Sequence, residues 1–150
     1  MKKFIVFFLL CLCLLVSSLF KQEFDFSKYS NLRVQVFTNS KCETRFNGAT
    51  YVDNGNGQII ICDYETYKKV CEKQNNISGI TYIFDGNIEV FDKVIRDLNV
   101  LFTEKTDNSF VGFTNYFSCC VKSDNKKVNV QGYYSNGKIY IGSPLILGSY

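Results

Sequence analysis

The stretch NVQGYYSNGKIYIGSPLI, from Asn129 to Ile146, decides the fold of this chain. Apolar and polar side chains alternate on both sides of its Asn136-Gly137 step, with the two-residue period of half-buried strands. Asn-Gly between two such runs is a strong hairpin signal, because both turn positions tolerate positive φ. The stretch therefore predicts an antiparallel β-hairpin near the C-terminus.

Similar patterns predict strands through the rest of the chain. They cover residues 32–36, 43–52 (interrupted at Asn47-Gly48), 58–62, 80–84, 100–104, 110–121, 128–134 and 139–141. Helical spacing predicts two helices. The first follows an Asp63 cap and ends near residue 75, and the second has its apolar face at Ile88, Phe91, Ile95 and Leu98.

This order of elements predicts an α+β fold: a mainly antiparallel, curved sheet with two helices packed on one face. The chain has 150 residues, a length that suits one compact domain. We place that domain at residues 31–150, preceded by a connector at residues 19–30. Phe24 and Phe26 within the connector are expected to pack onto the domain.

The N-terminus resembles a secretory signal peptide. Lys2 and Lys3 precede an apolar run from Phe4 to Val16, and small residues follow at Ser17 and Ser18. The apolar run is shorter than the roughly 20 residues of a transmembrane helix. We expect residues 1–18 to be a cleaved signal, with a retained N-terminal membrane anchor as the alternative, and an extracytoplasmic location in either case.

The charge of the exported chain does not favour nucleic-acid binding. Removing Lys2 and Lys3 lowers the 17 basic side chains to 15, against 14 acidic ones. The remaining lysines are interspersed with acidic residues, so no basic stripe of the kind that binds phosphate backbones is present in the sequence.

Five of the seven cysteines would remain after signal cleavage: Cys42, Cys62, Cys71, Cys119 and Cys120. Their odd number in an exported chain means that at least one thiol is free, modified or paired with another molecule. We expect one or two disulfides plus buried apolar cysteines, or a reactive thiol at the Cys119-Cys120 pair. Neighbours on a strand point to opposite faces, so one of that pair is expected to face outward.

Common catalytic and cofactor motifs are missing from the sequence. There is no histidine, no CxxC pair, no Walker sequence and no GxGxxG, so the sequence predicts no metal site, no cofactor and no Ser-His or Cys-His nucleophile. A carboxylate pair among Asp53, Asp63 and Asp85 would suit a hydrolase of wall polymers, but turn and capping roles already account for these three residues.

The C-terminal half resembles the YwmB-like family of exported bacterial proteins. The resemblance covers residues 80–150 and is carried by a strand ending in Asp85-Gly86, the Val111-Gly112-Phe113-Thr114 step, the sequence VNVQ at 128–131 and IGSP at 141–144. It implies the family's TATA-box-binding-protein-like fold, a saddle-shaped antiparallel sheet backed by helices. The fold name describes a shape and implies no DNA binding.

These observations favour a non-enzymatic bacterial cell-envelope protein that binds an envelope protein or a wall ligand with one face or edge of its sheet. Any membrane contact would come through an uncleaved N-terminus. The main alternative is a thiol-dependent redox protein using Cys119 or Cys120. The candidate binding residues flank the C-terminal turn: Tyr133, Tyr134, Asn136 and Tyr140.

Overall fold

The structure, a computed structural model, describes residues 23–146; the expected signal peptide lies outside this range. Its elements are, in chain order, β1 (Arg33–Thr38), β2 (Thr50–Asn54), β3 (Gly57–Cys62), α2 (Tyr64–Lys73), β4 (Ile77–Asp85), α3 (Ile88–Asp97), β5 (Leu101–Lys105), β6 (Ser109–Phe113), β7 (Val121–Ser123), β8 (Lys126–Val128), β9 (Val130–Ser135) and β10 (Lys138–Ser143).

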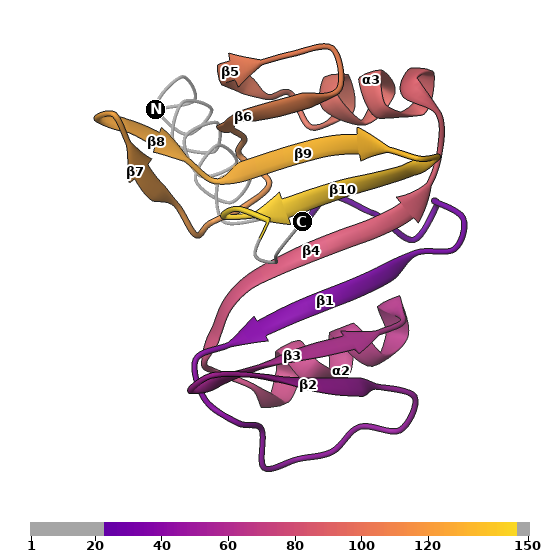
Figure 1. The fold of residues 1–150 in the computed structure, drawn as a ribbon, viewed down its shortest axis with the longest axis vertical. Coiled ribbons are helices and arrows are strands. Elements are labelled where there is room, and N and C mark those ends of the chain that lie inside the picture. Colours follow the sequence, from indigo (N-terminus) through magenta and orange to yellow (C-terminus); the bar gives the residue numbers. More distant parts are fainter. Residues whose placement is uncertain (1–22, 147–150) are drawn as a thin grey trace, which may run out of the picture.

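Eight of the strands form one twisted sheet in the order β2-β3-β1-β4-β10-β9-β6-β5, and all neighbouring strands in it are antiparallel (Figure 1). β7 and β8 pair separately as a small hairpin. β4 and β10 lie at the centre of the large sheet, and we call their pairing the seam. The first four strands lie on one side of it and the later ones on the other. The predicted α+β class with a mostly antiparallel sheet is confirmed.

Both helices begin where the sequence places a cap. The Asp63 carboxylate accepts a 2.7 Å hydrogen bond from the Thr66 N–H, and the Asn87 side chain accepts one of 3.0 Å from the Val90 N–H. Each cap satisfies an amide that has no partner within the helix. α2 ends at Lys73, slightly before the predicted end.

The two helices cover the same face of the sheet. Tyr67 of α2 contacts Tyr82 of β4, and Phe91 of α3 contacts Phe110 of β6, with ring centroids 5.8 Å apart in each case. The strand register places Tyr82 and Phe110 on one face, through Ile141 and Gly132 between them. We call it the covered face and the opposite one the open face.

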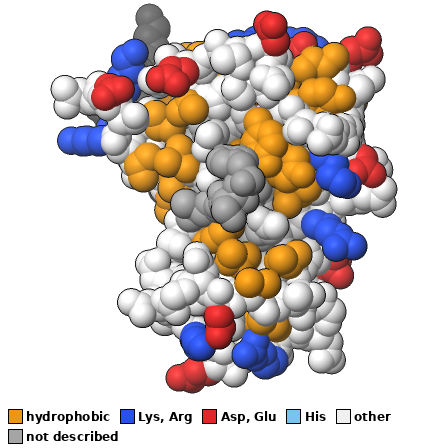
Figure 2. All heavy atoms as spheres, in the orientation of Figure 1, with side chains coloured by type: hydrophobic (Ala, Val, Ile, Leu, Met, Phe, Trp, Pro, Cys, Tyr) orange, Lys and Arg blue, Asp and Glu red, His pale blue; other side chains and the backbone are white. Residues whose placement is uncertain are grey.

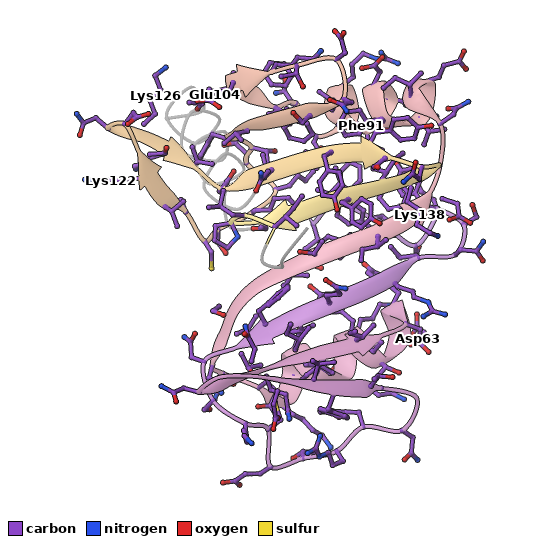
Figure 3. All side chains as sticks on the ribbon, in the orientation of Figure 1. Asp63, Phe91, Glu104, Lys122, Lys126 and Lys138 are labelled. Carbon is purple, nitrogen blue, oxygen red and sulfur yellow. The ribbon has the colours of Figure 1, made fainter. Side chains whose placement is uncertain are left out.

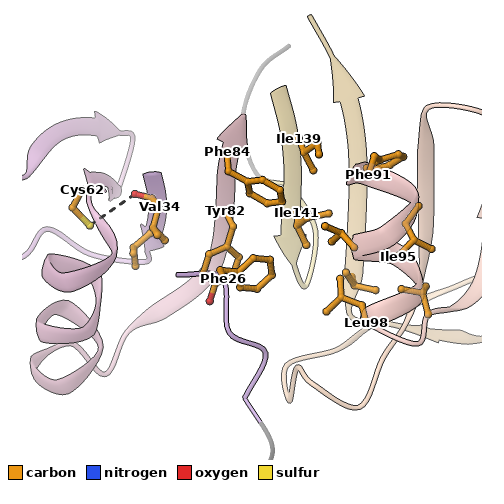
Figure 4. Packing of buried hydrophobic residues seen from close by; sticks show 14 of the residues in the cluster. Phe26, Val34, Cys62, Tyr82, Phe84, Phe91, Ile95, Leu98, Ile139 and Ile141 are labelled. Atoms are coloured by element: carbon orange, nitrogen blue, oxygen red, sulfur yellow. Dashed lines mark hydrogen bonds between the residues drawn. The ribbon is translucent and has the colours of Figure 1, made fainter. Parts of the chain in front are cut away.

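Aromatic rings from outside the sheet fill the space between the two helices. Phe26 is 1% exposed and stacks on Tyr82, with ring centroids 3.9 Å apart and planes 10° apart (Figure 4). Phe117, from the segment after β6, lies 6.4 Å from both of these rings. The predicted packing of Phe26 onto the domain is thus observed. Because its ring is part of the core, the domain begins before residue 31.

A buried asparagine holds the segment that carries Phe117. Asn129 is fully buried, and its side-chain carbonyl accepts the Thr114 N–H at 2.8 Å. Its side-chain amide donates to the main-chain carbonyls of Thr114 and Phe117, each at 2.7 Å. These bonds satisfy backbone groups that would otherwise be buried without partners.

Two predicted strands are shorter than expected. Within 43–52 only the part from Thr50 is strand, because side chains take the backbone groups before it: the Tyr51 hydroxyl accepts the Phe46 N–H at 2.6 Å. Within 110–121, β6 ends at Phe113 because the next amide bonds to Asn129 instead of a neighbouring strand. The prediction of a strand through Cys119-Cys120 is therefore wrong.

Candidate functional site

The C-terminal hairpin separates the four predicted binding residues. Asn136 and Gly137 form the turn with φ values of 51° and 75°, as the sequence predicts. Tyr134 faces the covered side, where its ring lies 6.4 Å from that of Phe91 on α3. Tyr133 and Tyr140 face the open side and stack, with centroids 4.2 Å apart and planes 6° apart. The structure thus brings together Tyr133 and Tyr140 only.

Around this tyrosine pair, the open face carries further apolar side chains. Tyr140 lies opposite Ile83 of β4 as well as Tyr133, so the three form one row across three strands. Figure 2 shows hydrophobic side chains gathered over the middle of this face. We give the name open-face patch to six of the half-buried ones: Ile61, Ile83, Val111, Phe113, Tyr133 and Tyr140.

A shallow hollow of about 790 Å³ adjoins this patch at one end. Ile61 and Ile83 line it, together with charged Arg33, Asp85 and Lys138. The Asp85 carboxylate accepts hydrogen bonds from Asn31 at 2.5 Å and from Lys138 at 2.8 Å, and these two contacts lower its pKa. Lys138 lines the hollow, whereas Lys122 and Lys126 lie on the β7–β8 hairpin at the other side of the view (Figure 3). An apolar surface with a charged rim is suited to a protein partner.

A second concavity lies on the covered face, between α2 and the segment after β6. It has a volume of about 470 Å³ and is lined mainly by the aromatic side chains of Phe24, Tyr64, Tyr67, Tyr82, Tyr116 and Phe117. The Tyr67 and Tyr82 hydroxyls hydrogen-bond to each other at 2.9 Å, and burial raises the pKa of both. Both hydroxyls are therefore neutral at physiological pH, so they can hydrogen-bond a ligand but do not act as bases.

The five cysteines of the described residues are all free thiols, so the structure contains none of the expected disulfides among them. Cys42 and Cys62 are buried, and the Cys62 thiol donates to the Val34 carbonyl at 3.8 Å. Burial raises the pKa of Cys62 to about 11, and partial burial of its thiol also raises the pKa of Cys71. A raised pKa lowers the thiolate fraction, which disfavours nucleophilic chemistry at both positions.

Cys119 and Cys120 are both exposed, in the segment between β6 and β7. The expectation that one faces inward depended on a strand that ends earlier in the structure. Cys119 lines the same aromatic concavity as Cys71. Because Cys71 and Cys119 line the same concavity, the structure supports a thiol-dependent role at this place more than at Cys120.

The three candidate carboxylates have the structural roles that the sequence indicates. Asp63 caps α2, and Asp53 accepts hydrogen bonds from Lys41 at 2.7 Å and from Gln58 at 3.1 Å. These contacts, like those of Asp85, lower the carboxyl pKa. A general acid needs a raised pKa, so the geometry does not support a hydrolytic pair here. Within residues 23–146, no group of three or more Cys, Asp or Glu side chains is placed to hold a metal ion.

Sequence reasoning missed Ile83, Gln131 and Gly142 as members of the same surface as the two tyrosines. The two-residue period places Gln131 with Tyr133, and Gly142 with Tyr140. The two-residue alternation does not indicate which of the two faces the helices cover. Only the assembled sheet shows this.

None of the helices in the described part of the chain has the length and apolar character needed to cross a membrane. Comparison of the chain with protein-family models, with curated proteins and with solved structures finds no match.

Proposed function

We propose that this chain is an exported bacterial cell-envelope protein that acts as a non-enzymatic binding module, with the open face of its sheet as the contact surface for a protein partner. One observation carries the proposal: among residues 23–146 no helix covers the open face of the eight-stranded sheet, and yet this face presents the apolar open-face patch. Antiparallel sheets that meet only water normally expose polar side chains there. Apolar patches on a surface mark sites of interaction.

The expected export and the family resemblance belong to this proposal. The support for a TATA-box-binding-protein-like, YwmB-like fold is the element order after residue 80, in which a strand, a helix and four sheet strands follow in the expected sequence. The support for export is the signal-like N-terminal sequence. The intact mass of the natively expressed chain tests export, because cleavage after Ser18 gives an N-terminus at Leu19.

Site-directed crosslinking tests the binding surface. A photoreactive phenylalanine analogue placed at Tyr140 in the cells that express the chain should give a discrete adduct with another protein. The same analogue at Lys93, exposed on α3, is the matched control for the opposite side. Adducts from both positions alike, or from neither, would show that the open face is not a selective contact surface.

The thiol-dependent alternative uses Cys119 or Cys120, and its structural support is that Cys119 lines one concavity together with Cys71. It predicts that a disulfide-bonded thiol oxidant of the native compartment takes two electrons and two protons from the Cys71 and Cys119 thiols, is itself reduced to the dithiol, and leaves a form of this chain with the two sulfurs joined. Alkylation before and after reduction, followed by mass measurement, separates the two proposals. Full labelling of Cys71 and Cys119 without reduction would leave only the binding proposal.

A further inference from the structure

The open face already carries one polypeptide segment, which belongs to the chain itself. After β10 ends at Ser143, residues 144–146 turn back against that strand. A Cβ atom added to Gly142 would lie 2.6 Å from the Ile146 nitrogen and 2.7 Å from its Cα. Real Cβ atoms do not approach other atoms so closely, so only glycine at this position lets the segment lie against the sheet.

A side chain of the neighbouring strand fixes the position of this segment. The Gln131 side-chain carbonyl accepts a 3.1 Å hydrogen bond from the Ile146 N–H. Gln131 and Gly142 are cross-strand partners, so the acceptor and the glycine lie side by side. Together they recognise a main-chain amide and a closely approaching backbone, which are features of any extended peptide. We call this pair the seat.

Thr81 provides an independent indication that the seat is built for a ligand. Thr81 lies on β4, where it is the cross-strand partner of Gly142 on β10. It points to the open face, yet it is only 1% exposed. Its hydroxyl has no hydrogen-bond partner among the described residues. A buried hydroxyl without a partner costs free energy, which an incoming main-chain group would recover.

We propose that the seat binds an extended segment of a partner protein, with an aliphatic side chain at the position of Ile146, and that residues 144–146 occupy the seat until the partner displaces them. The inference rests on the proposed function and names the ligand class, an extended peptide segment. Gln131 and Gly142 would recognise the main chain of this segment, and its apolar side chains would pack against the adjoining open-face patch. Residues 144–146, which we call the tail, are covalently joined to β10. Their effective concentration at the seat is therefore high, on the order of millimolar for a short linker. A free ligand therefore binds the intact chain weakly.

A peptide added in trans tests this proposal on the full chain. The probe is a fluorescently labelled peptide with the sequence of residues 143–150, SPLILGSY. The variant Ile146→Glu places a charge at the seat and should release the tail without altering the sheet. We expect this variant to bind the probe about 10 to 100 times more tightly than the wild-type chain, by fluorescence anisotropy.

A double variant provides the matched control. Adding Gly142→Ala to Ile146→Glu should abolish probe binding, because the new methyl group blocks any backbone that approaches the sheet. Chemical shift changes at Gln131 and Gly142 should accompany binding to the single variant. Equal binding to the wild-type chain and Ile146→Glu, or binding to neither, would overturn the proposal.

The outcomes also separate this inference from the proposed function. Protein adducts at Tyr140 without probe binding would leave the open face as a contact surface and remove the seat. Probe binding without adducts at Tyr140 would keep the seat and overturn the proposed function of the open-face patch. Concentration-dependent dimers of the wild-type chain that disappear in Ile146→Glu would show that each copy seats its residues 144–146 on the other, and would replace the partner protein with a second copy of this chain.

Discussion

The covered and the open face of the sheet come from the same strands but differ in what lies on them. On β4 and β10, Phe84, Ile139 and Ile141 point to the covered face and are fully buried. Their neighbours Ile83 and Tyr140 point to the open face and are only half-buried, although they are just as apolar. The covered face thus accounts for most of the stability, whereas the apolar side chains of the open face are the basis of the proposed binding. Substitutions on the two faces should therefore have different consequences.

The largest difference should come from an aromatic truncation on each face. Phe26→Ala removes a ring that is 1% exposed and stacked on Tyr82, so we expect the free energy of unfolding to fall by about 3–5 kcal/mol. Tyr133→Ala removes a half-buried ring and its stack on Tyr140, which should cost about 1–2 kcal/mol. Urea unfolding measures both. Equal losses would contradict the division between the faces.

Polar side chains should sharpen the same comparison. Asn129→Ala leaves buried main-chain groups of Thr114 and Phe117 without partners, which should cost about 2–4 kcal/mol. It should also speed hydrogen exchange in residues 114–117. Gln131→Ala on the open face removes a single bond to Ile146 and should cost about 1 kcal/mol or less. A small loss for Asn129→Ala would mean that water replaces its hydrogen bonds.

The glycines of the hairpin offer a matched pair, one for each face. A Cβ at Gly132 would lie 2.3 Å from the buried Phe110 ring, so Gly132→Ala should destabilise the fold by about 2–3 kcal/mol. At Gly142 the obstructed atoms belong to residues 144–146, which can move into solvent. Gly142→Ala should cost about 1 kcal/mol and expose the Ile146 amide to exchange. Protection of that amide in Gly142→Ala would contradict the assigned contact.

The last effect is absent at neutral pH and concerns a thiol on the covered face. Burial raises the pKa of Cys62 from about 9 to about 11, so the folded state keeps a proton that the unfolded state loses. The resulting stability is fully present below pH 9 and is lost as the pH rises through 11, by about 2–3 kcal/mol. Cys62→Ala should flatten this slope in urea unfolding at a series of pH values. Cys120→Ala, at an exposed position, should leave the slope unchanged.

Local sequence signals predicted the parts of the fold that depend on near neighbours. The Asp63 cap and the Asn136-Gly137 turn are interactions within a few residues, and both are observed. Phe26 and Asn129 were harder to assign because their partners lie far away in sequence: Phe26 stacks on a ring of β4, and Asn129 holds the segment at 114–117. A pattern of alternation contains no information about such contacts.

The candidate binding residues show the same limit. Alternation correctly separates Tyr133 from Tyr134, but it does not say which of them meets a helix. Tyr134 packs near Phe91 on α3, and Asn136 forms the turn, so both have structural roles. The seat was not predicted because it depends on a return of the chain after Ser143 that no periodic pattern indicates.

The seam has a consequence for the order in which the chain is made. β4 becomes available when about half of the chain has been synthesised, but its seam partner, β10, is the last strand of the sheet along the chain. Until β10 arrives, the edge of β4 is an open row of main-chain donors and acceptors on an apolar strand, the kind of edge that pairs with other chains. During synthesis the chain therefore has an unpaired β4 edge that is prone to aggregate. In a chain that is truncated before β10, this edge would stay unpaired.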